Sequence, residues 1–299
     1  MHYYETKIYL FFRRFYFRYI GIPNAYRISS KLNILNSKDS IQYILEHHCS
    51  VSRFGDGEFS IIWGGGNEFQ DPNQRLAKML SEVLNSRLTN HMVGIPYHIK
   101  DVSNHIDPGN FWAPFTARNI KRLMNILSKN RLYLNASMTR FYRENKNKSQ
   151  CPELIAMLKQ LWDGRDIVIV EGCLTRSGVG NDLYDNAASI LRVLGPASNA
   201  INKYDEMLSA IKQNVPKDRL VILCYGMAAT VLAYDLAKEG YWALDLGHMD
   251  IEYEWFRMGA NEQRVAIKCK FVNEVPEGHI VETCDDPIYQ SQILVDITK

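Results

Sequence analysis

The chain has 299 residues, of which 46% are hydrophobic and 23% are charged, and its formal net charge is +2. This composition supports a large buried core, which excludes general disorder, and the nearly neutral charge argues against a protein built mainly to bind nucleic acid. The six scattered cysteines form no C-x-x-C pair and no apolar run reaches the length of a membrane span. We therefore expect reduced thiols and a cytoplasmic protein.

The first segment to stand out is KIYLFFRRFYFRYIGIPNAYR, residues 7–27, which crowds aromatic side chains around four arginines. These are Arg13, Arg14, Arg18 and Arg27. It is not a secretory signal, because arginines interrupt its apolar core and no small-residue cleavage site follows. Two interpretations of this basic, aromatic helix stay open. It lies on an anionic membrane surface, such as the inner face of the plasma membrane, or it packs on the main domain or a second subunit.

We expect residues 1–48 to form this N-terminal helical extension and residues 49–299 to form one domain, in which β-rich runs alternate with amphipathic helices. The predicted strands are 50–54, 92–95, 131–136, 166–170, 220–224 and 242–246. The predicted helices are one after the N-cap Asp71 and Pro72, one from 152 or 153 towards 162, one at 181–194 and one at 227–238. This alternation predicts a Rossmann-like α/β fold, with a mainly parallel sheet covered by helices on both faces. Ligands of such sheets bind beyond the carboxyl ends of the strands.

At the end of the first predicted strand, RFGDGEF (residues 53–59) places Asp56 and Glu58 on either side of Gly57. Two carboxylates this close repel each other unless a cation or a set of hydrogen-bond donors lies between them. One interpretation is an ordinary surface turn, because Gly and Asp are common turn residues. The other is half of a metal site.

The segment EGCLTRSGVGND, residues 171–182, follows the predicted strand 166–170. Glycines between a strand and a helix allow backbone N–H groups to approach an anion, and an arginine adds a donor suited to phosphate oxygens. The candidate ligand-binding residues here are Glu171, Arg176, Gly178, Gly180, Asn181 and Asp182. The alternative is a plain turn with a satisfied arginine, in which Asp182 serves only as a helix N-cap.

Two further strand ends carry candidate groups. Gly226, in the turn YGMAAT, is placed to contact a nucleobase, ribose or phosphate edge, although close strand–helix packing explains a glycine equally well. GHMDIEYEW, residues 247–255, places His248, Asp250, Glu252 and Glu254 on one face if it is extended. If it is helical, His248 pairs with Glu252 and Asp250 pairs with Glu254. Imidazole and carboxylates suit Mn²⁺ or Mg²⁺, whereas the alternative is a solvated acidic helix face.

Two arginines also lie near the ends of predicted strands. Arg53 directly precedes the segment with the acid pair, and Arg140 follows the predicted strand 131–136. Arg53 and Arg140 are placed either to balance phosphate charge or to neutralise neighbouring carboxylates. The segment VGIPYHI, residues 93–99, is a candidate wall of a sugar or base pocket. The aromatic segment NFWAPF, residues 110–115, is a candidate platform for an acceptor sugar, although buried aromatic side chains more often belong to the core.

Taken together, several motifs resemble the GT-D-fold glycosyltransferases, formerly a domain of unknown function that includes streptococcal enzymes extending adhesin glycans. The motifs are RFGDGEF, EGCLTRSGVGNDLYDNA, NAINKYDEML and ATVLAYDLAKEGYWALDLGHMDIEYEWF, and the resemblance runs from about residue 50 to 274. Two departures are Cys173, where the family usually has a second carboxylate, and Met227, where it tends to have proline.

The resemblance implies a UDP-sugar donor and a divalent metal bound through a D-x-E motif, here Asp56 and Glu58, with His248 as a further candidate ligand. It implies transfer of a hexose, from UDP-glucose or UDP-galactose, to a glycan, lipid-linked glycan or glycoprotein acceptor in exopolysaccharide, capsule or glycoprotein glycan synthesis. If the reaction inverts configuration, a carboxylate must accept the acceptor proton, and Asp250 and Glu252 are the candidates.

Two rival functions remain at this point. The same carboxylates and histidine would suit a metal-dependent phosphoesterase that activates water. A non-catalytic module of a polysaccharide assembly complex would also bind a nucleotide sugar. Dependence of UDP release on an added glycan acceptor separates the transferase from both.

Overall fold

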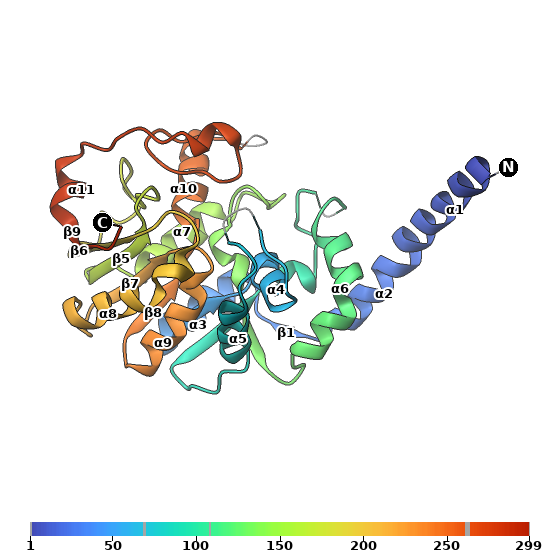
Figure 1. Cartoon of the computed structure of the whole chain (residues 1–299), viewed down its shortest axis with the longest axis horizontal. Coiled ribbons are helices and arrows are strands. Elements are labelled where there is room, and N and C mark those ends of the chain that lie inside the picture. The colour runs from blue at the N-terminus through green and yellow to red at the C-terminus, as the bar shows by residue number, and fades with distance from the viewer. Residues whose placement is uncertain (1, 68–69, 108, 261–263, 299) are drawn as a thin grey trace.

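The computed structural model describes residues 2–67, 70–107, 109–260 and 264–298, and it is built around one nine-stranded sheet (Figure 1). Every strand pair is parallel, and the strand order is β1-β4-β3-β2-β8-β7-β5-β6-β9. The strands are β1 (Asn33–Ile34), β2 (Ser50–Arg53), β3 (His91–Ile95), β4 (Leu132–Asn135), β5 (Asp166–Gly172), β6 (Ser189–Gly195), β7 (Leu220–Cys224), β8 (Trp242–Asp245) and β9 (Ile293–Asp296). The predicted Rossmann-like α/β sheet is confirmed.

Helices cover both faces of the sheet, because the strands are apolar on both sides. In β5, Val168 and Val170 belong to one buried cluster, and Ile167 and Ile169 belong to the other. The first cluster includes residues of α4 (Asp56–Ile62), α5 (Gln74–Leu84), α6 (Trp112–Ile126), α8 (Tyr204–Asn214) and α9 (Ala228–Lys238). The second includes residues of α3 (Ser37–His47), α7 (Cys151–Gln160) and α10 (Met249–Met258). The remaining helices are α1 (His2–Tyr16), α2 (Ile22–Ser29), α11 (Pro287–Gln292), the π-helix η1 (Phe17–Gly21) and the 3₁₀ helices η2 (Tyr97–Ile99), η3 (Ala136–Thr139), η4 (Ala200–Lys203) and η5 (Pro276–His279).

All six predicted strands are present, with ends that differ by at most two residues from the prediction. The helices predicted from 152 or 153 and from 227 are also present, as α7 and α9. The helix predicted after Asp71 begins later. Asn73 is its N-cap, with a side chain that accepts a hydrogen bond from the Leu76 amide at 2.9 Å, whereas the amide of Asp71 donates to Asn199.

The prediction of a helix at 181–194 is wrong. Residues 181–188 form turns, and β6 follows and pairs along its whole length with β5. Gly178 and Gly180 both have positive φ, so the chain turns before it reaches Asn181. The apolar residues of this segment fill a place in the sheet, a tertiary contact that outweighs their local helical pattern.

The N-terminal segment forms the predicted helices, but residues 1–48 do not behave as one extension. β1 joins the sheet beside β4, and Ile41 and Ile44 of α3 are fully buried. The part that stands away from the body consists of α1, η1 and the start of α2 (Figure 1). Within residues 1–48, β1 and α3 thus pack into the body of the molecule, and Ala25, Ser29 and Leu32 are also buried.

All six cysteines are free thiols, and three of them, Cys49, Cys151 and Cys224, are buried. Burial raises the pKa of the Cys49 thiol to about 12. Among the described residues no helix combines the length and the apolar character that crossing a bilayer requires.

Candidate functional site

A cavity of about 500 Å³ lies beyond the carboxyl ends of the central strands. The chain proceeds from β2 through β3 to β4 on one side of the sheet, while β8, β7 and β5 lie on the other side of β2. The boundary between β2 and β8 is thus a topological switch point, where the loops after neighbouring strands diverge and leave a crevice. The cavity opens at this boundary, and residues that follow β2 and β8 form its floor.

Asp56 and Glu58 both line this cavity, because the chain turns directly from β2 into α4. The acid pair therefore occupies the first turn of a helix, and the surface-turn interpretation is wrong. Glu58 folds back so that its Oε2 accepts a hydrogen bond from the Gly55 amide at 2.6 Å. Carboxylates at this end of a helix are stabilised by the exposed N–H groups of the first turn.

The two carboxylates also lie in an environment that disfavours negative charge. Burial, with the Asp245 and Asp56 carboxylates nearby, raises the pKa of Glu58 to about 7. The pKa of Asp56 is also raised, chiefly by burial and in part by Glu144, although Arg140 opposes this. A cation placed between these groups would remove the repulsion.

Two neighbouring side chains approach Gly57 closely. A Cβ at this position would lie 2.5 Å from Cε of Met227 and 3.1 Å from Nδ2 of Asn67. Met227 and Asn67 also line the cavity. Met227 of the YGMAAT turn therefore lines the cavity beside the acid pair.

Arg53 lies at the switch point and is held by the end of β8. Its Nη2 lies 3.1 Å from Oδ1 of Asp245, and its Nη1 donates to Oγ1 of Thr139 at 2.8 Å. Asp245 also accepts a hydrogen bond from the Arg53 amide. The guanidinium is thereby fixed in one orientation at the cavity floor.

A second charged group forms the wall after β4. Arg140 contacts Glu274 at 3.1 Å and Glu144 at 3.7 Å, and all three line the cavity. His248 lines it as well, and burial together with Arg140 and Arg53 lowers its pKa although Glu274 opposes the shift. A neutral imidazole at this wall can accept or donate a hydrogen bond without adding charge.

Gly226 and Asp250 are the remaining predicted residues that line the cavity. Gly226 has a φ of +55°, and no heavy atom lies within 4 Å of the place a Cβ would occupy. The backbone after β7 therefore faces the cavity without side-chain bulk. Seven predicted residues, namely Arg53, Asp56, Glu58, Arg140, Gly226, His248 and Asp250, thus share one cavity.

Arg176 does not line the cavity. Its Nη1 donates to the backbone oxygens of Cys269 at 2.7 Å and Glu282 at 2.6 Å, and the residue is buried. The expectation that it contacts phosphate is therefore not met, because the guanidinium ties the C-terminal segment to the loop after β5. Gly178 is explained by packing, since a Cβ there would overlap the ring of Tyr184.

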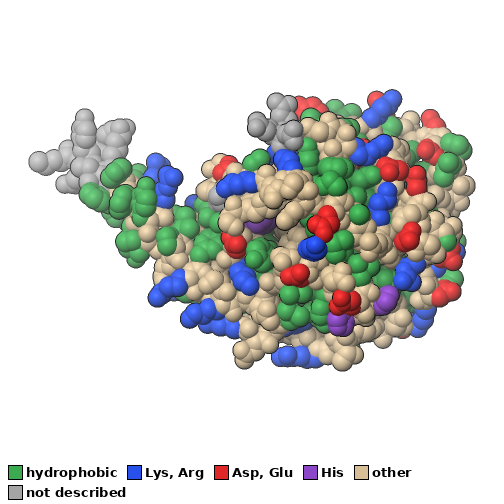
Figure 2. All heavy atoms as spheres, turned by 180° about the vertical axis from the view of Figure 1, so that it is seen from behind, with side chains coloured by type: hydrophobic (Ala, Val, Ile, Leu, Met, Phe, Trp, Pro, Cys, Tyr) green, Lys and Arg blue, Asp and Glu red, His purple; other side chains and the backbone are tan. Residues whose placement is uncertain are grey.

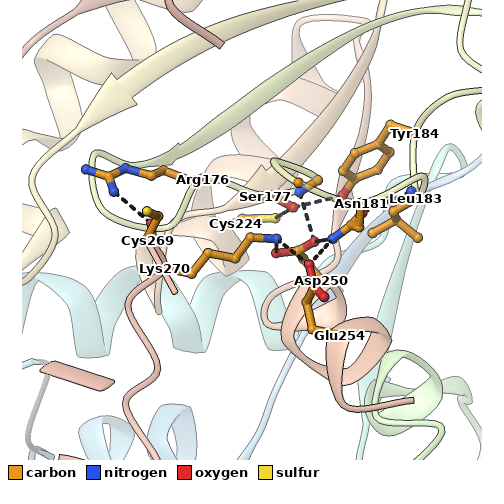
Figure 3. A network of polar contacts seen from close by, with 12 residues as sticks. Arg176, Ser177, Asn181, Leu183, Tyr184, Cys224, Asp250, Glu254, Cys269 and Lys270 are labelled. Atoms are coloured by element: carbon orange, nitrogen blue, oxygen red, sulfur yellow. Dashed lines mark hydrogen bonds and ion pairs between the residues drawn. The ribbon is translucent and has the colours of Figure 1, made fainter. Parts of the chain in front are cut away.

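The same loop supplies a closed polar network (Figure 3). Oδ1 of Asp250 accepts from the Gly178 amide at 2.9 Å and from Nδ2 of Asn181 at 2.7 Å, and its Oδ2 accepts from Nζ of Lys270 at 2.7 Å. Glu254 is bound by Asn181 and Lys270 as well. The Gly178 amide and the Asn181 side chain, which were expected to bind a ligand, instead donate hydrogen bonds to carboxylates of α10.

Neither candidate base has the contacts that a catalytic base needs. Both oxygens of Asp250 are occupied by the network. Glu252 lies outside the cavity lining, where its Oε2 accepts from the amides of Tyr142 at 3.0 Å and Arg143 at 2.9 Å. These contacts of Asp250 and Glu252 anchor α10, and the assignment of a catalytic base to either residue stays a prediction.

Glu171 and Asp182 also lie outside the cavity lining. Glu171 is fully buried and pairs with Arg192 of β6 at 2.5 Å. Asp182 is exposed, and its Oδ1 accepts from the Tyr253 hydroxyl at 2.9 Å. Gly180 has no contact that a Cβ would disturb, but its φ of +77° favours glycine. The lining therefore excludes Glu171, Arg176, Gly178, Gly180, Asn181, Asp182 and Glu252.

Sequence reasoning missed three carboxylates of the cavity, Asp245, Glu144 and Glu274. Asp245 ends a predicted strand, which is the signal that could have identified it. Glu144 lies four residues after Arg140 in the segment that follows β4, a spacing that could have pointed to it. Glu274 is distant in the chain, and only the folded structure brings it to Arg140.

Among the described residues, one group of three side chains presents metal-ligating atoms within 4.8 Å of one another: His98, His105 and Glu144. His248 does not form such a group with Asp56 and Glu58. The backbone N–H of Asp107 donates to Nδ1 of His105 at 3.0 Å, so a neutral His105 carries its proton on Nε2, the atom that faces Glu144. This arrangement favours a histidine–carboxylate contact behind the cavity wall.

Comparison with known proteins decides the family. The model of the glycosyltransferase GT-D fold family matches residues 51–275. The chain belongs to this family. A solved structure described as the highly conserved domain of unknown function 1792, with a distinct glycosyltransferase fold, is 35% identical, has a TM-score of 0.86 and covers 92% of this chain and 99% of its own. A second, a new glycosyltransferase from Streptococcus sanguinis, has a TM-score of 0.83 at 35% identity and covers 89% of this chain and 100% of its own.

Two curated relatives are longer proteins. A probable glycosyl transferase Gly of Streptococcus gordonii is 36% identical over 273 residues, which is 90% of this chain and 39% of the relative. Glycosyltransferase GlyD of Streptococcus pneumoniae serotype 4 is 33% identical over 278 residues, 90% of this chain and 33% of the relative. The chain thus spans about two fifths and one third of these relatives.

Proposed function

We propose that this GT-D family member is a metal-dependent glycosyltransferase, which moves a hexose from a UDP-sugar, most readily UDP-glucose or UDP-galactose, to a glycan acceptor. The observation that carries the proposal is the cavity at the β2/β8 switch point, where the Asp56–Glu58 pair and fixed arginines meet. Such an arrangement suits a diphosphate, whose negative charge needs both a cation and directed donors.

In the proposed reaction the acceptor hydroxyl oxygen forms a bond to the anomeric carbon, and its proton passes to a carboxylate of the cavity. The bond from the anomeric carbon to the diphosphate breaks, and UDP leaves. Arg53 and Arg140 stabilise the charge that develops on the diphosphate. Asp245 and Glu274 hold these guanidinium groups in place at 3.1 Å each, so little reorganisation is needed during the reaction. The Gly226 turn provides a backbone surface for the nucleotide.

The residues fit a hard divalent ion such as Mn²⁺ or Mg²⁺. Asp56 and Glu58 are oxygen ligands, and their pKa values are raised by burial and by neighbouring carboxylates, as expected for a site that gains from a cation. When bound, the ion acts as a Lewis acid on the diphosphate. His248 is a weaker candidate ligand, because it does not share a preformed group with the acid pair.

A groove of about 300 Å³ that shares Asp56 with the main cavity supports an acceptor site beside the donor. Trp63 and Phe115 line this groove and stack with ring centroids 6.3 Å apart. Phe111 stacks on Phe115 and reaches the main cavity. Flat aromatic faces beside a reaction centre suit a sugar ring. The acceptor is therefore a glycan, free or linked to a lipid or protein, in exopolysaccharide, capsule or glycoprotein glycan synthesis.

The test is release of UDP from several UDP-sugars, measured with Mn²⁺ or with a chelator and with or without a glycan acceptor. We expect turnover that needs both metal and acceptor and that Asp56→Ala abolishes. Asp182→Ala is the matched control, because it removes an exposed carboxylate outside the cavity and should leave turnover unchanged. Equal, metal-independent turnover by the wild type and Asp56→Ala would refute the metal assignment. UDP binding without turnover would instead support a binding module.

A further inference from the structure

We infer that the projecting N-terminal segment, residues 9–20 of α1 and η1, binds the surface of an anionic membrane. Figure 2 shows hydrophobic side chains gathered along this segment, with basic side chains beside them, away from the body of the molecule. The inference does not depend on the reaction proposed above, because it rests on a surface that takes no part in the cavity.

The segment exposes far more aromatic surface than a stable surface helix needs. Between 51% and 65% of each aromatic residue in the following set is solvent accessible: Tyr9, Phe11, Phe12, Phe15, Tyr16 and Tyr19. Helical spacing places Phe11 and Phe15 on one line and Tyr9, Phe12 and Tyr16 on the next, so the rings form one continuous face. A contiguous apolar face of this kind marks an interaction surface.

The arginines lie where an interfacial helix carries them. Arg14 and Arg18 are four residues apart and border one edge of the aromatic face, where the guanidinium of Arg18 lies 5.9 Å from the centroid of the Tyr19 ring. Arg13 borders the other edge. Aromatic rings enter the boundary between headgroups and acyl chains, and arginines beside them reach the lipid phosphates.

The charge of the whole segment selects an anionic partner. Residues 9–20 carry three basic residues, Arg13, Arg14 and Arg18, and no acidic residue. Two copies of this segment placed side by side would bring like charges together, which disfavours a second copy of the chain as the partner. Anionic lipids attract each of these residues.

The segment is held firmly to the domain. The Tyr26 hydroxyl of α2 donates to the backbone oxygen of His98 at 2.8 Å, and Ala25 is buried against the body. At the junction, the guanidinium of Arg118 lies 5.7 Å from the ring of Phe17. Both Arg118 and Phe115 belong to α6, so membrane binding would fix the orientation of the groove beside Asp56 relative to the lipid.

The experiment is co-sedimentation of the full chain with phosphatidylcholine vesicles that contain or lack phosphatidylserine. We expect binding to the anionic vesicles only. Arg14→Glu with Arg18→Glu should lower the partition coefficient at least 25-fold, because each lost basic contact near an anionic surface costs about fivefold. Phe11→Ser with Phe15→Ser should lower it at least tenfold.

Two double variants elsewhere on the surface serve as matched controls. Lys78→Glu with Lys129→Glu reverses two exposed charges outside the segment, and Ile280→Ser with Ile288→Ser removes two exposed apolar side chains. Both should bind like the wild type. Absence of binding, or binding that the segment variants leave unchanged, overturns the inference. A lipid-free dimer in sedimentation velocity that Phe11→Ser with Phe15→Ser dissociates overturns it in favour of a second copy.

Discussion

Two strand ends of this protein carry the same kinds of residue and use them in opposite ways. After β2, Asp56 and Glu58 face a cavity, and burial together with neighbouring carboxylates raises the pKa of both groups. After β5, Asn181 and the Gly178 amide meet Asp250 in a network where each charged group has a partner. Glycines, carboxylates and amides that follow a strand can thus form either a ligand-binding site or a set of hydrogen bonds that holds a loop to a neighbouring helix.

The difference lies in what approaches each strand end. The C-terminal segment carries Lys270 over the loop after β5 and supplies the cation that Asp250 needs. At the switch point between β2 and β8, the covering loops diverge, so the acid pair keeps its exposure to a ligand. Four variants can break or sharpen this comparison.

The largest effect is expected from Lys270→Met in the closed network. Lys270 and Asp250 are both almost fully buried, so the variant leaves the Asp250 and Glu254 carboxylates without their cation. Loss of one partner of a buried ion pair costs about 3–5 kcal/mol of unfolding free energy. Urea unfolding measures it. Lys268→Met, two residues away and exposed, is the control and should change the free energy by less than about 0.5 kcal/mol.

Asp56→Asn should lower turnover strongly and change stability little, which is the opposite of the effect expected for Lys270→Met. We expect turnover to fall about 10²–10³-fold, equivalent to about 3–4 kcal/mol in the barrier, while the unfolding free energy changes by less than about 1 kcal/mol. Steady-state kinetics and urea unfolding on the same samples measure both. If the variant loses unfolding free energy but keeps its turnover, Asp56 stabilises the fold and does not act in the reaction.

The pH dependence of the unfolding free energy tests the protonation state of His98, which lies beside Glu144 of the cavity wall. Burial lowers the pKa of His98 from 6.5 to about 4, although Glu144 opposes the shift and His105 adds to it. The unfolded chain therefore takes up a proton that the folded chain does not, and stability present above pH 6.5 is lost as the pH falls towards 4. Between pH 6.5 and 4.5 this loss approaches about 2.5 kcal/mol for this group.

His98→Phe is the matched variant, because a phenyl ring can keep the stacking on Trp112, whose ring centroid lies 5.5 Å away. The difference in unfolding free energy between the wild type and the variant should narrow or reverse as the pH falls. A pH-independent difference would mean that His98 does not remain neutral in the folded protein.

The smallest effect is expected from Asp182→Asn. Although this residue lies in the glycine-rich motif, it is exposed and bound by Tyr253 and Lys159. We expect changes of no more than about 1 kcal/mol in unfolding free energy and less than twofold in turnover. A larger loss of turnover, with the unfolding free energy unchanged, would show that the loop after β5 contributes to the ligand site.

The sequence predicted the class of the fold well, because periodicity and cap signals are local. Six strands, three of the helices and the acid pair at a strand end were all predicted from runs of fewer than fifteen residues. Two short edge strands, β1 and β9, escaped because their pairing depends on partners distant in the chain. The segment 181–194 was misassigned for the same reason, since its place beside β5 decides its conformation.

What the sequence alone determined, then, is which residues can carry charge and where each strand ends. Only the tertiary structure decided which of those charges face a cavity. Asp56 and Arg176 both follow strands of one sheet, yet Asp56 opens to the crevice at the switch point while Arg176 binds backbone oxygens of the C-terminal segment. That outcome depends on strand order and on which distant loop covers each strand end, and neither is encoded in the local pattern around the residue.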